Sequence, residues 1–80
     1  MNDSRLRWQC RRGMREMDEL LTAYFDDRFK GAPEWEKSAF RRLLELPDPA
    51  LIGYLLGGDE ATDRELAHVI GRIRSGTRTG

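Results

Sequence analysis

Residues 14–25, with the sequence Met-Arg-Glu-Met-Asp-Glu-Leu-Leu-Thr-Ala-Tyr-Phe, carry the strongest periodic pattern in the chain. Apolar side chains recur at the i, i+3, i+7 and i+10 spacing, which gathers them on one face of an α-helix. The apolar stripe consists of Met14, Met17, Leu20 or Leu21, and Tyr24 or Phe25. Asp18 and Glu19 face away from it. The stretch therefore predicts an amphipathic helix that ends before Gly31 and needs other helices to cover its apolar face.

A shorter helix is expected before this one, from Asp3 or Ser4, either of which can serve as N-cap, to Arg12. Its apolar positions are Leu6 and Cys10, four apart, with Trp8 on a neighbouring flank. Gly13 then interrupts the helical pattern, and a glycine that follows a run of arginines is typical of a helix C-terminus. The sequence thus predicts two helices joined at Gly13.

A third helix is expected from Pro33, because proline suits the first position of a helix, where its missing N–H is not needed. Glu34 and Glu36 lie in the first turn, where carboxylates favour the positive end of the helix dipole. The side chains expected to be buried are Trp35, Ala39, Phe40, Leu43, Leu44 and Leu46.

Two further helices are predicted in the second half of the chain. Residues 46–49, Leu-Pro-Asp-Pro, stop the third helix, and Asp48 is a good N-cap for a short, very apolar fourth helix that residues 57–58, Gly-Gly, terminate. Thr62 and Glu65 match the capping-box spacing and open a fifth helix. Its apolar stripe is Leu66, Val69, Ile70 and Ile73.

Strand signals are nearly absent, since β-branched residues are few and no stretch alternates cleanly. The fold class is therefore all-α: a compact single-domain bundle of about five short helices over residues 1–75, followed by a flexible polar tail at 76–80. A chain of 80 residues has a thin core, which argues against a deep pocket for a large cofactor and against a self-contained enzyme.

The charge of the chain is balanced but unevenly distributed. Fourteen Lys and Arg oppose fourteen Asp and Glu, so the net charge gives no attraction to nucleic acid or to a membrane. The N-terminal arginines are Arg5, Arg7, Arg11, Arg12 and Arg15, and the carboxylates that follow are Glu16, Asp18, Glu19, Asp26 and Asp27. A basic face beside an acidic one suits a polar protein partner.

The single cysteine, Cys10, allows no internal disulfide and indicates a reducing compartment. The N-terminus has no apolar stretch typical of a secretory signal, and no segment approaches the roughly 20 apolar residues of a membrane span. A cytoplasmic location is the expectation.

No residue set resembles catalytic machinery. His68, the only histidine, is expected to face solvent without a partner, and Cys10 to be a small buried hydrophobe. Glu16 and Glu19 share a helix face, but neighbouring arginines favour solvated ion pairs over an acid/base pair. The spacing of Cys and His offers no metal site, and no glycine-rich nucleotide loop occurs. We therefore expect a protein that is not an enzyme.

Residues 11–16, Arg-Arg-Gly-Met-Arg-Glu, admit two interpretations. In the first they form a helix–helix corner, with arginines satisfying the last carbonyls of one helix and Glu16 capping the next. In the second they form an exposed binding epitope, because arginine bonds carboxylates bidentately and glycine lets another backbone come close. The pattern leaves both open.

Residues 8–18, Trp-Gln-Cys-Arg-Arg-Gly-Met-Arg-Glu-Met-Asp, resemble the signature of the succinate dehydrogenase flavinylation factors, the SdhE family of FAD assembly factors. The family hallmark is Arg-Gly-x-x-Glu, matched by Arg12, Gly13 and Glu16. Residues 40–51, Phe-Arg-Arg-Leu-Leu-Glu-Leu-Pro-Asp-Pro-Ala-Leu, are similar to the family's Leu-Leu-Glu…Asp-Pro-x-Leu segment. The resemblance covers residues 6–56 well and the last helix loosely.

The resemblance implies a five-helix bundle that binds the flavoprotein subunit of succinate dehydrogenase, and often that of fumarate reductase, and promotes covalent attachment of FAD to a histidine there. FAD then belongs to the client, this chain binds no cofactor stably, and the free chain is expected to be a monomer. The residues expected to contact the client are Arg12, Gly13, Glu16, Arg11, Arg15, Trp8 and Asp18. Tyr54 stands where family members often have tryptophan, which departs from the pattern.

Within that interpretation, Arg12 is expected to pair with a client carboxylate or carbonyl, Gly13 to permit close approach, and Glu16 to bond the client or to orient Arg12. Two alternatives stay open. Some family members have been described as antitoxin-like interaction proteins, which would have a different protein partner. In a small nucleic-acid-binding domain, Arg5, Arg12 and Trp8 would contact backbone and base, although the chain lacks the basic excess of such domains.

Overall fold

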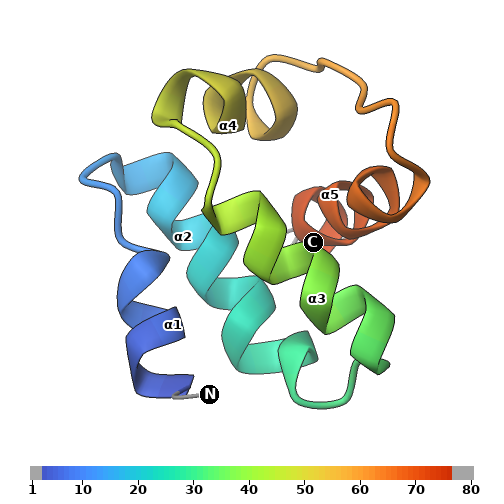
Figure 1. Ribbon diagram of the computed structural model, residues 1–80. Helices are drawn as coiled ribbons and strands as arrows, with labels where there is room; N and C mark the ends of the chain where they lie inside the picture. The colour runs from blue at the N-terminus through green and yellow to red at the C-terminus, as the bar shows by residue number, and fades with distance from the viewer. Residues whose placement is uncertain (1–2, 77–80) are drawn as a thin grey trace.

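The computed structural model describes residues 3–76, which form five α-helices and one π-helical turn (Figure 1). The elements are α1 (Asp3–Gln9), α2 (Arg15–Tyr24), η1 (Phe25–Phe29), α3 (Glu34–Leu44), α4 (Asp48–Leu55) and α5 (Arg64–Gly76). No strand occurs within residues 3–76, so the predicted all-α class is confirmed. The predicted tail lies outside the described residues except for Gly76, which still belongs to α5.

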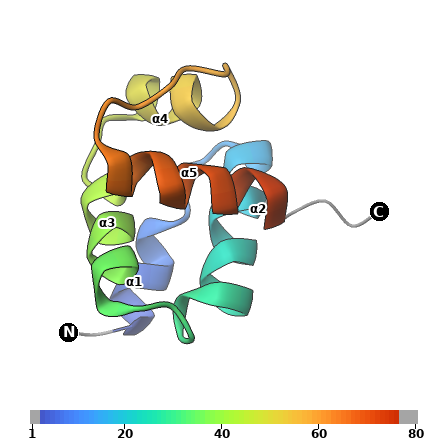
Figure 2. The same cartoon turned by 90° about the vertical axis from the view of Figure 1, so that its right-hand side faces the viewer.

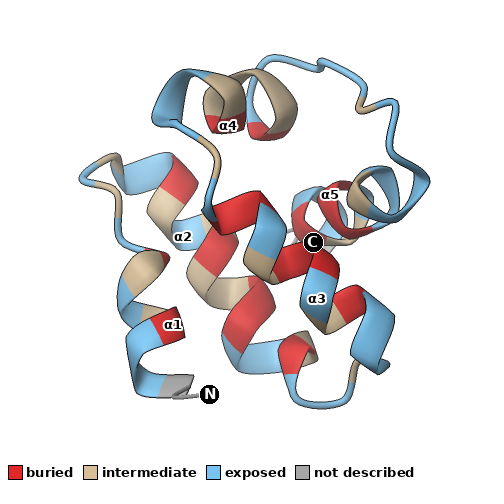
Figure 3. Cartoon of the chain, in the orientation of Figure 1, coloured by how far each residue is buried: buried red, intermediate tan, exposed pale blue. Residues whose placement is uncertain are grey.

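Helix α5 lies across α2 and α3, while α1 flanks α2 and α4 covers one end of the bundle (Figures 1 and 2). The apolar faces of the helices meet in one core, and the outward faces are exposed (Figure 3). The fully buried side chains include those predicted from the stripe of α2, at Met17, Leu21 and Tyr24. The stripe of α5 is also confirmed, with Val69, Ile70 and Ile73 buried and Leu66 packed at the margin.

The π-helical turn η1 extends α2 and shapes the aromatic part of the core. Phe25 and Phe29 stack with their ring centroids 5.0 Å apart, and Phe29 packs 5.5 Å from Phe40 of α3. Tyr24 lies 4.7 Å from Phe40 on the other side. The wider turn lets consecutive aromatic residues of one helix face the same core. The helical segment ends before Gly31, as predicted.

The end of α1 and the starts of α3 and α4 differ from the prediction, because backbone groups take the capping positions there. Helix α1 ends at Gln9 rather than Arg12, since the amides of Cys10 and Arg11 turn back to the carbonyls of Arg7 and Trp8. Helices α3 and α4 are capped by Pro33 and Pro47, whose extended backbones present their carbonyls to the following turn. Asp48 is therefore the first residue of α4 and not its N-cap.

The predicted capping box at Thr62 and Glu65 is wrong. The carboxylate of Asp63 accepts the backbone N–H of Leu66 at 3.0 Å, so Asp63 caps α5. This hydrogen bond and the neighbouring Arg42 guanidinium lower the pKa of the Asp63 carboxyl group. Glu65 turns instead to Arg42, at 3.3 Å.

Burial along α3 also differs from the prediction at three positions. Trp35 is 43% exposed, because the inward position of the first turn is taken by Glu36, which is 2% exposed. Leu46 lies beyond the end of α3 and is only half-buried. Ala39, Phe40, Leu43 and Leu44 are buried as predicted.

Candidate functional site

The corner between α1 and α2 is built around Gly13, whose backbone has a φ of +86°. This left-handed conformation costs residues with a side chain free energy and is readily adopted by glycine. Gly13 is exposed, and a Cβ atom at this position would meet nothing within 4 Å. Glycine is therefore required here by the backbone angle and not by a tight contact, and the open space leaves the corner accessible to a partner.

The carboxylate of Asp18 holds the corner from the side of α2. It accepts the backbone N–H of Arg12 at 2.7 Å and that of Gly13 at 3.2 Å. These amides lie outside the helix and would otherwise need water. Asp18, predicted to contact the client, is thus a backbone anchor of the corner.

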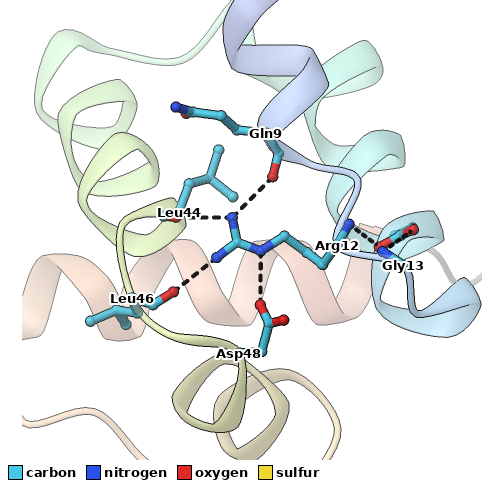
Figure 4. A network of polar contacts seen from close by, with 7 residues as sticks. Gln9, Arg12, Gly13, Leu44, Leu46 and Asp48 are labelled. Carbon is cyan, nitrogen blue, oxygen red and sulfur yellow. Dashed lines mark hydrogen bonds and ion pairs between the residues drawn. The ribbon is translucent and has the colours of Figure 1, made fainter.

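The Arg12 side chain holds the corner from the opposite side (Figure 4). Its guanidinium donates four hydrogen bonds: Nη1 to the carbonyls of Gln9 and Leu44 at 3.1 Å each, Nη2 to the carbonyl of Leu46 at 2.8 Å, and Nε to Asp48 Oδ1 at 3.1 Å. The side chain is 16% exposed. The guanidinium is therefore turned inward, where it satisfies carbonyls at the C-terminal ends of α1 and α3. For α1 this is the contact that the corner interpretation predicted, whereas the epitope interpretation expected Arg12 to be exposed.

The remaining predicted residues of the corner are exposed. Arg15 is 92% exposed and makes an ion pair with Glu19, one helical turn later, at 3.5 Å. The side chains of Arg11 and Glu16 make no hydrogen bond or ion pair with another described residue. Glu16 neither caps α2, whose N-cap Met14 has no side-chain partner, nor touches Arg12. Trp8 is 71% exposed on α1.

A shallow groove of about 410 Å³ lies beside this corner, along α2 and the start of η1. It is lined by Arg11, Asp18, Glu19, Thr22, Ala23 and Asp26. Asp26, which lines the groove, accepts a two-pronged contact from Arg7 of α1, at 3.0 Å for both hydrogen bonds. This contact lowers the pKa of the Asp26 carboxyl group. The groove shares Arg11 and Asp18 with the corner, so the two form one continuous surface.

Cys10 lies beneath this surface and is fully buried, as predicted. Its thiol donates to the carbonyl of Leu6 at 3.6 Å, and burial raises its pKa to about 12. The thiol is therefore protonated at neutral pH and is not a nucleophile.

A second polar cluster, which the sequence did not predict, surrounds the buried carboxylate of Glu36. Glu36 Oε2 accepts the Tyr24 hydroxyl at 2.7 Å and lies 3.4 Å from Arg72 Nε, while Oε1 lies 3.2 Å from His68 Nε2. Burial and the hydrogen bond to Glu36 raise the pKa of Tyr24. His68 is exposed, as expected, but has a partner, and its ring also meets the edge of Trp35 at 4.9 Å. The cluster joins α2, α3 and α5 and is separate from the corner.

No group of three or more His, Cys, Asp or Glu among residues 3–76 is arranged to hold a metal ion. None of the described helices has the length and apolar character needed to span a bilayer. The feature best suited to recognition is the exposed corner.

Comparison with known proteins agrees with the signature around this corner. Residues 4–77 match a family described as the flavinator of succinate dehydrogenase. The chain is 39% identical over 74 residues to the FAD assembly factor SdhE of Shewanella oneidensis, covering 92% of this chain and 90% of that protein. It is 40% identical over 74 residues to the SdhE of Yersinia pestis, covering 92% and 84%. It is 39% identical over 70 residues to the SdhE of Coxiella burnetii, covering 88% and 85%.

Proposed function

The chain belongs to the family of succinate dehydrogenase flavinators, and we propose on this ground that it binds the flavoprotein subunit of succinate dehydrogenase and promotes covalent attachment of FAD to that subunit. The family match spans nearly the whole chain, and the relatives are named FAD assembly factors. The flavoprotein subunit of fumarate reductase is a second proposed client, on the ground of the resemblance of residues 8–18 to the SdhE signature.

The observation that carries the proposal is the exposed corner, in which a fixed glycine backbone stands beside a carboxylate without a partner among the described residues. Gly13 is open to close approach by another chain, and Glu16 follows in the first turn of α2. Arg11 and Arg15 add cationic groups and Trp8 an exposed aromatic ring. Mixed charges around an aromatic residue are typical of the rim and anchor of a protein interface.

The mechanism we propose is positioning rather than catalysis by this chain. The buried thiol of Cys10 stays protonated, and the Glu36 cluster lies away from the corner. FAD and the histidine that reacts with it would both belong to the client. The factor would stabilise the client conformation in which these two groups are aligned. This alignment would lower the barrier, because it reduces the entropic cost of reaching the reactive geometry.

The chain would act as a monomer in the cytoplasm, without a stably bound cofactor of its own. Two depressions on its described surface, beside α2 and beside Trp35, are shallow and measure about 410 Å³ each. A site for a dinucleotide normally buries most of its ligand. A flavin titration of the isolated chain, followed by flavin fluorescence, tests this part of the proposal.

The experiment for the main proposal compares Glu16→Ala with Glu60→Ala, an exposed glutamate in the connection between α4 and α5. Purified apo flavoprotein subunit is incubated with FAD and each variant, and covalent flavin is read as in-gel fluorescence of the client. We expect Glu16→Ala to slow flavinylation and Glu60→Ala to match the wild-type chain. Gly13→Arg, which places a bulky side chain on the corner, should abolish client binding. Normal flavinylation with folded Glu16→Ala and Gly13→Arg would remove this surface from the mechanism.

A further inference from the structure

Asp48 lies 36 positions after Arg12 in the chain, yet its carboxylate contacts the Arg12 guanidinium directly (Figure 4). The distance from Arg12 Nε to Asp48 Oδ1 is 3.1 Å, and the Asp48 side chain is 48% exposed. Asp48 is the first residue of α4, so this ion pair joins the α1–α2 corner to the start of a helix on another part of the bundle.

We infer that Asp48 is a positioning residue of the client-binding site, acting through Arg12, and that Arg12 shapes the corner from inside instead of contacting the client. The inference rests on the proposed function. It assigns Arg12, the first residue of the Arg-Gly-x-x-Glu motif, a structural role within the corner, which its four intramolecular hydrogen bonds support.

The geometry fixes residue 12 at both ends. The backbone N–H of Arg12 is bound by Asp18 of α2 at 2.7 Å, and the guanidinium is bound by carbonyls of α1 and of the α3–α4 connection. Carbonyls alone leave the positive charge without a counter-charge, and Asp48 supplies one. Its contact with Nε also holds the plane of the guanidinium, so that both Nη atoms face their carbonyls.

Because Arg12 is held on both sides, the backbone of the next residue, Gly13, is also restricted. A glycine has wide conformational freedom, and a partner that recognises a single conformation must otherwise bear the entropic cost of ordering it. With residue 12 anchored on two sides and the N–H of Gly13 bound to Asp18 at 3.2 Å, the corner is organised before the client arrives. Asp48 therefore contributes to client affinity without contacting the client.

The alternative, direct contact between Arg12 and a client carboxylate, predicts the opposite effect of removing Asp48. Arg12 would have to leave its intramolecular partners, and Asp48 would compete with the client for the guanidinium. Loss of the Asp48 charge would then leave client affinity unchanged or strengthen it. In the positioning role the same loss weakens client binding.

The test compares Asp48→Asn with Glu65→Gln. Glu65 is a matched control, because it also lies in the first helical turn, pairs with an arginine at 3.3 Å and is 53% exposed. The dissociation constant for the apo flavoprotein subunit of succinate dehydrogenase is measured by titration calorimetry, and amide NMR spectra of the free chains report on Arg12 and Gly13. We expect Asp48→Asn to raise the dissociation constant about fivefold and to shift both amides. Glu65→Gln should do neither.

Three further measurements separate positioning from general loss of stability. At saturating factor the flavinylation rate with Asp48→Asn should equal that of the wild-type chain, and Asp48→Glu should recover part of the affinity. Asp48→Asn should also add nothing to the loss caused by Arg12→Gln. Unchanged or tighter client binding by Asp48→Asn, or unshifted Gly13 and Arg12 amides, would overturn the role of Asp48. Failure of the wild-type chain to bind the subunit would overturn the proposed function itself.

Discussion

The carboxylate of Asp18 and the backbone N–H of Gly13 face each other across the α1–α2 corner at 3.2 Å, and the same carboxylate accepts the N–H of Arg12 at 2.7 Å. Arg12 and Gly13 lie between two helices, so no helical carbonyl accepts their N–H groups. Asp18, in the first turn of α2, accepts both instead. The two hydrogen bonds hold the backbone of the corner in the conformation that contains the left-handed glycine. The corner can therefore be tested as a structural unit and not only as a binding epitope.

Replacement of Asp18 by alanine should destabilise the chain by about 1–3 kcal/mol, because the half-buried amide of Arg12 loses a charged acceptor. The free energy of unfolding is obtained from urea denaturation. Asp27→Ala is the control, since Asp27 is exposed and has no partner among the described residues. We expect it to change stability by less than about 0.5 kcal/mol. Equal stability of the two variants would show that Asp18 does not anchor the corner.

Gly13→Ala should cost about 1–2 kcal/mol while leaving the fold intact, because the cost comes from the backbone angle and no atom lies near the new Cβ. Gly71→Ala is a matched comparison: Gly71 is exposed within α5 and likewise has nothing near a Cβ. There alanine should stabilise by about 0.5–1 kcal/mol, because it restricts the unfolded chain and favours helix. Thermal or urea unfolding gives both values, and changes of the same sign would contradict the assignment of strain to Gly13.

The helices and most of the core could be predicted because helical periodicity is local. Met17, Leu21 and Tyr24 are buried at the spacing that the sequence shows. One partner of Arg12, the carbonyl of Gln9 at the end of α1, follows from the corner interpretation, but the other three partners could not be predicted in this way. They are the carbonyls of Leu44 and Leu46 and the carboxylate of Asp48, which lie 32 to 36 positions away, and sequence spacing carries no information on which carbonyls a folded chain brings together.

The sequence contains two opposing indications of whether Glu36 is buried. Glu36 lies three to four positions before Ala39 and Phe40, which marks it as an inward position of α3, whereas its charge in a first turn favours solvent. Glu36 is buried, as the helical spacing indicates. Burial is possible because Tyr24 of α2 and Arg72 and His68 of α5 contact its carboxylate. Trp35 became exposed as the consequence.

Replacement of Glu36 by alanine should therefore destabilise the chain by about 3 kcal/mol. The change leaves the buried Tyr24 hydroxyl without its acceptor and Arg72 without its counter-charge, and it opens a small cavity between α2, α3 and α5. Glu34→Ala, at an exposed position two residues earlier, should change stability by less than about 0.5 kcal/mol. A Glu36→Ala variant with near wild-type stability in urea unfolding would show that the cluster does not hold the helices together.

Cys10 should make the stability of the chain fall as the pH rises above about 9. Burial raises the pKa of the native thiol from 9.0 to about 12, so the unfolded thiol loses its proton first and the native state binds more protons between these values. Under that condition the free energy of unfolding decreases with pH. Urea unfolding at pH 8 and pH 10 should therefore show a larger loss for the wild-type chain than for Cys10→Ala, which has no thiol to titrate. Tyr24 also contributes to the fall at high pH, but equally in both chains, so the difference between them isolates Cys10.

The buried thiol of Cys10 should also resist a disulfide reagent at pH 8 until the chain is unfolded. Rapid modification of the native chain, or identical pH dependence of the two proteins, would contradict the burial that determines this behaviour.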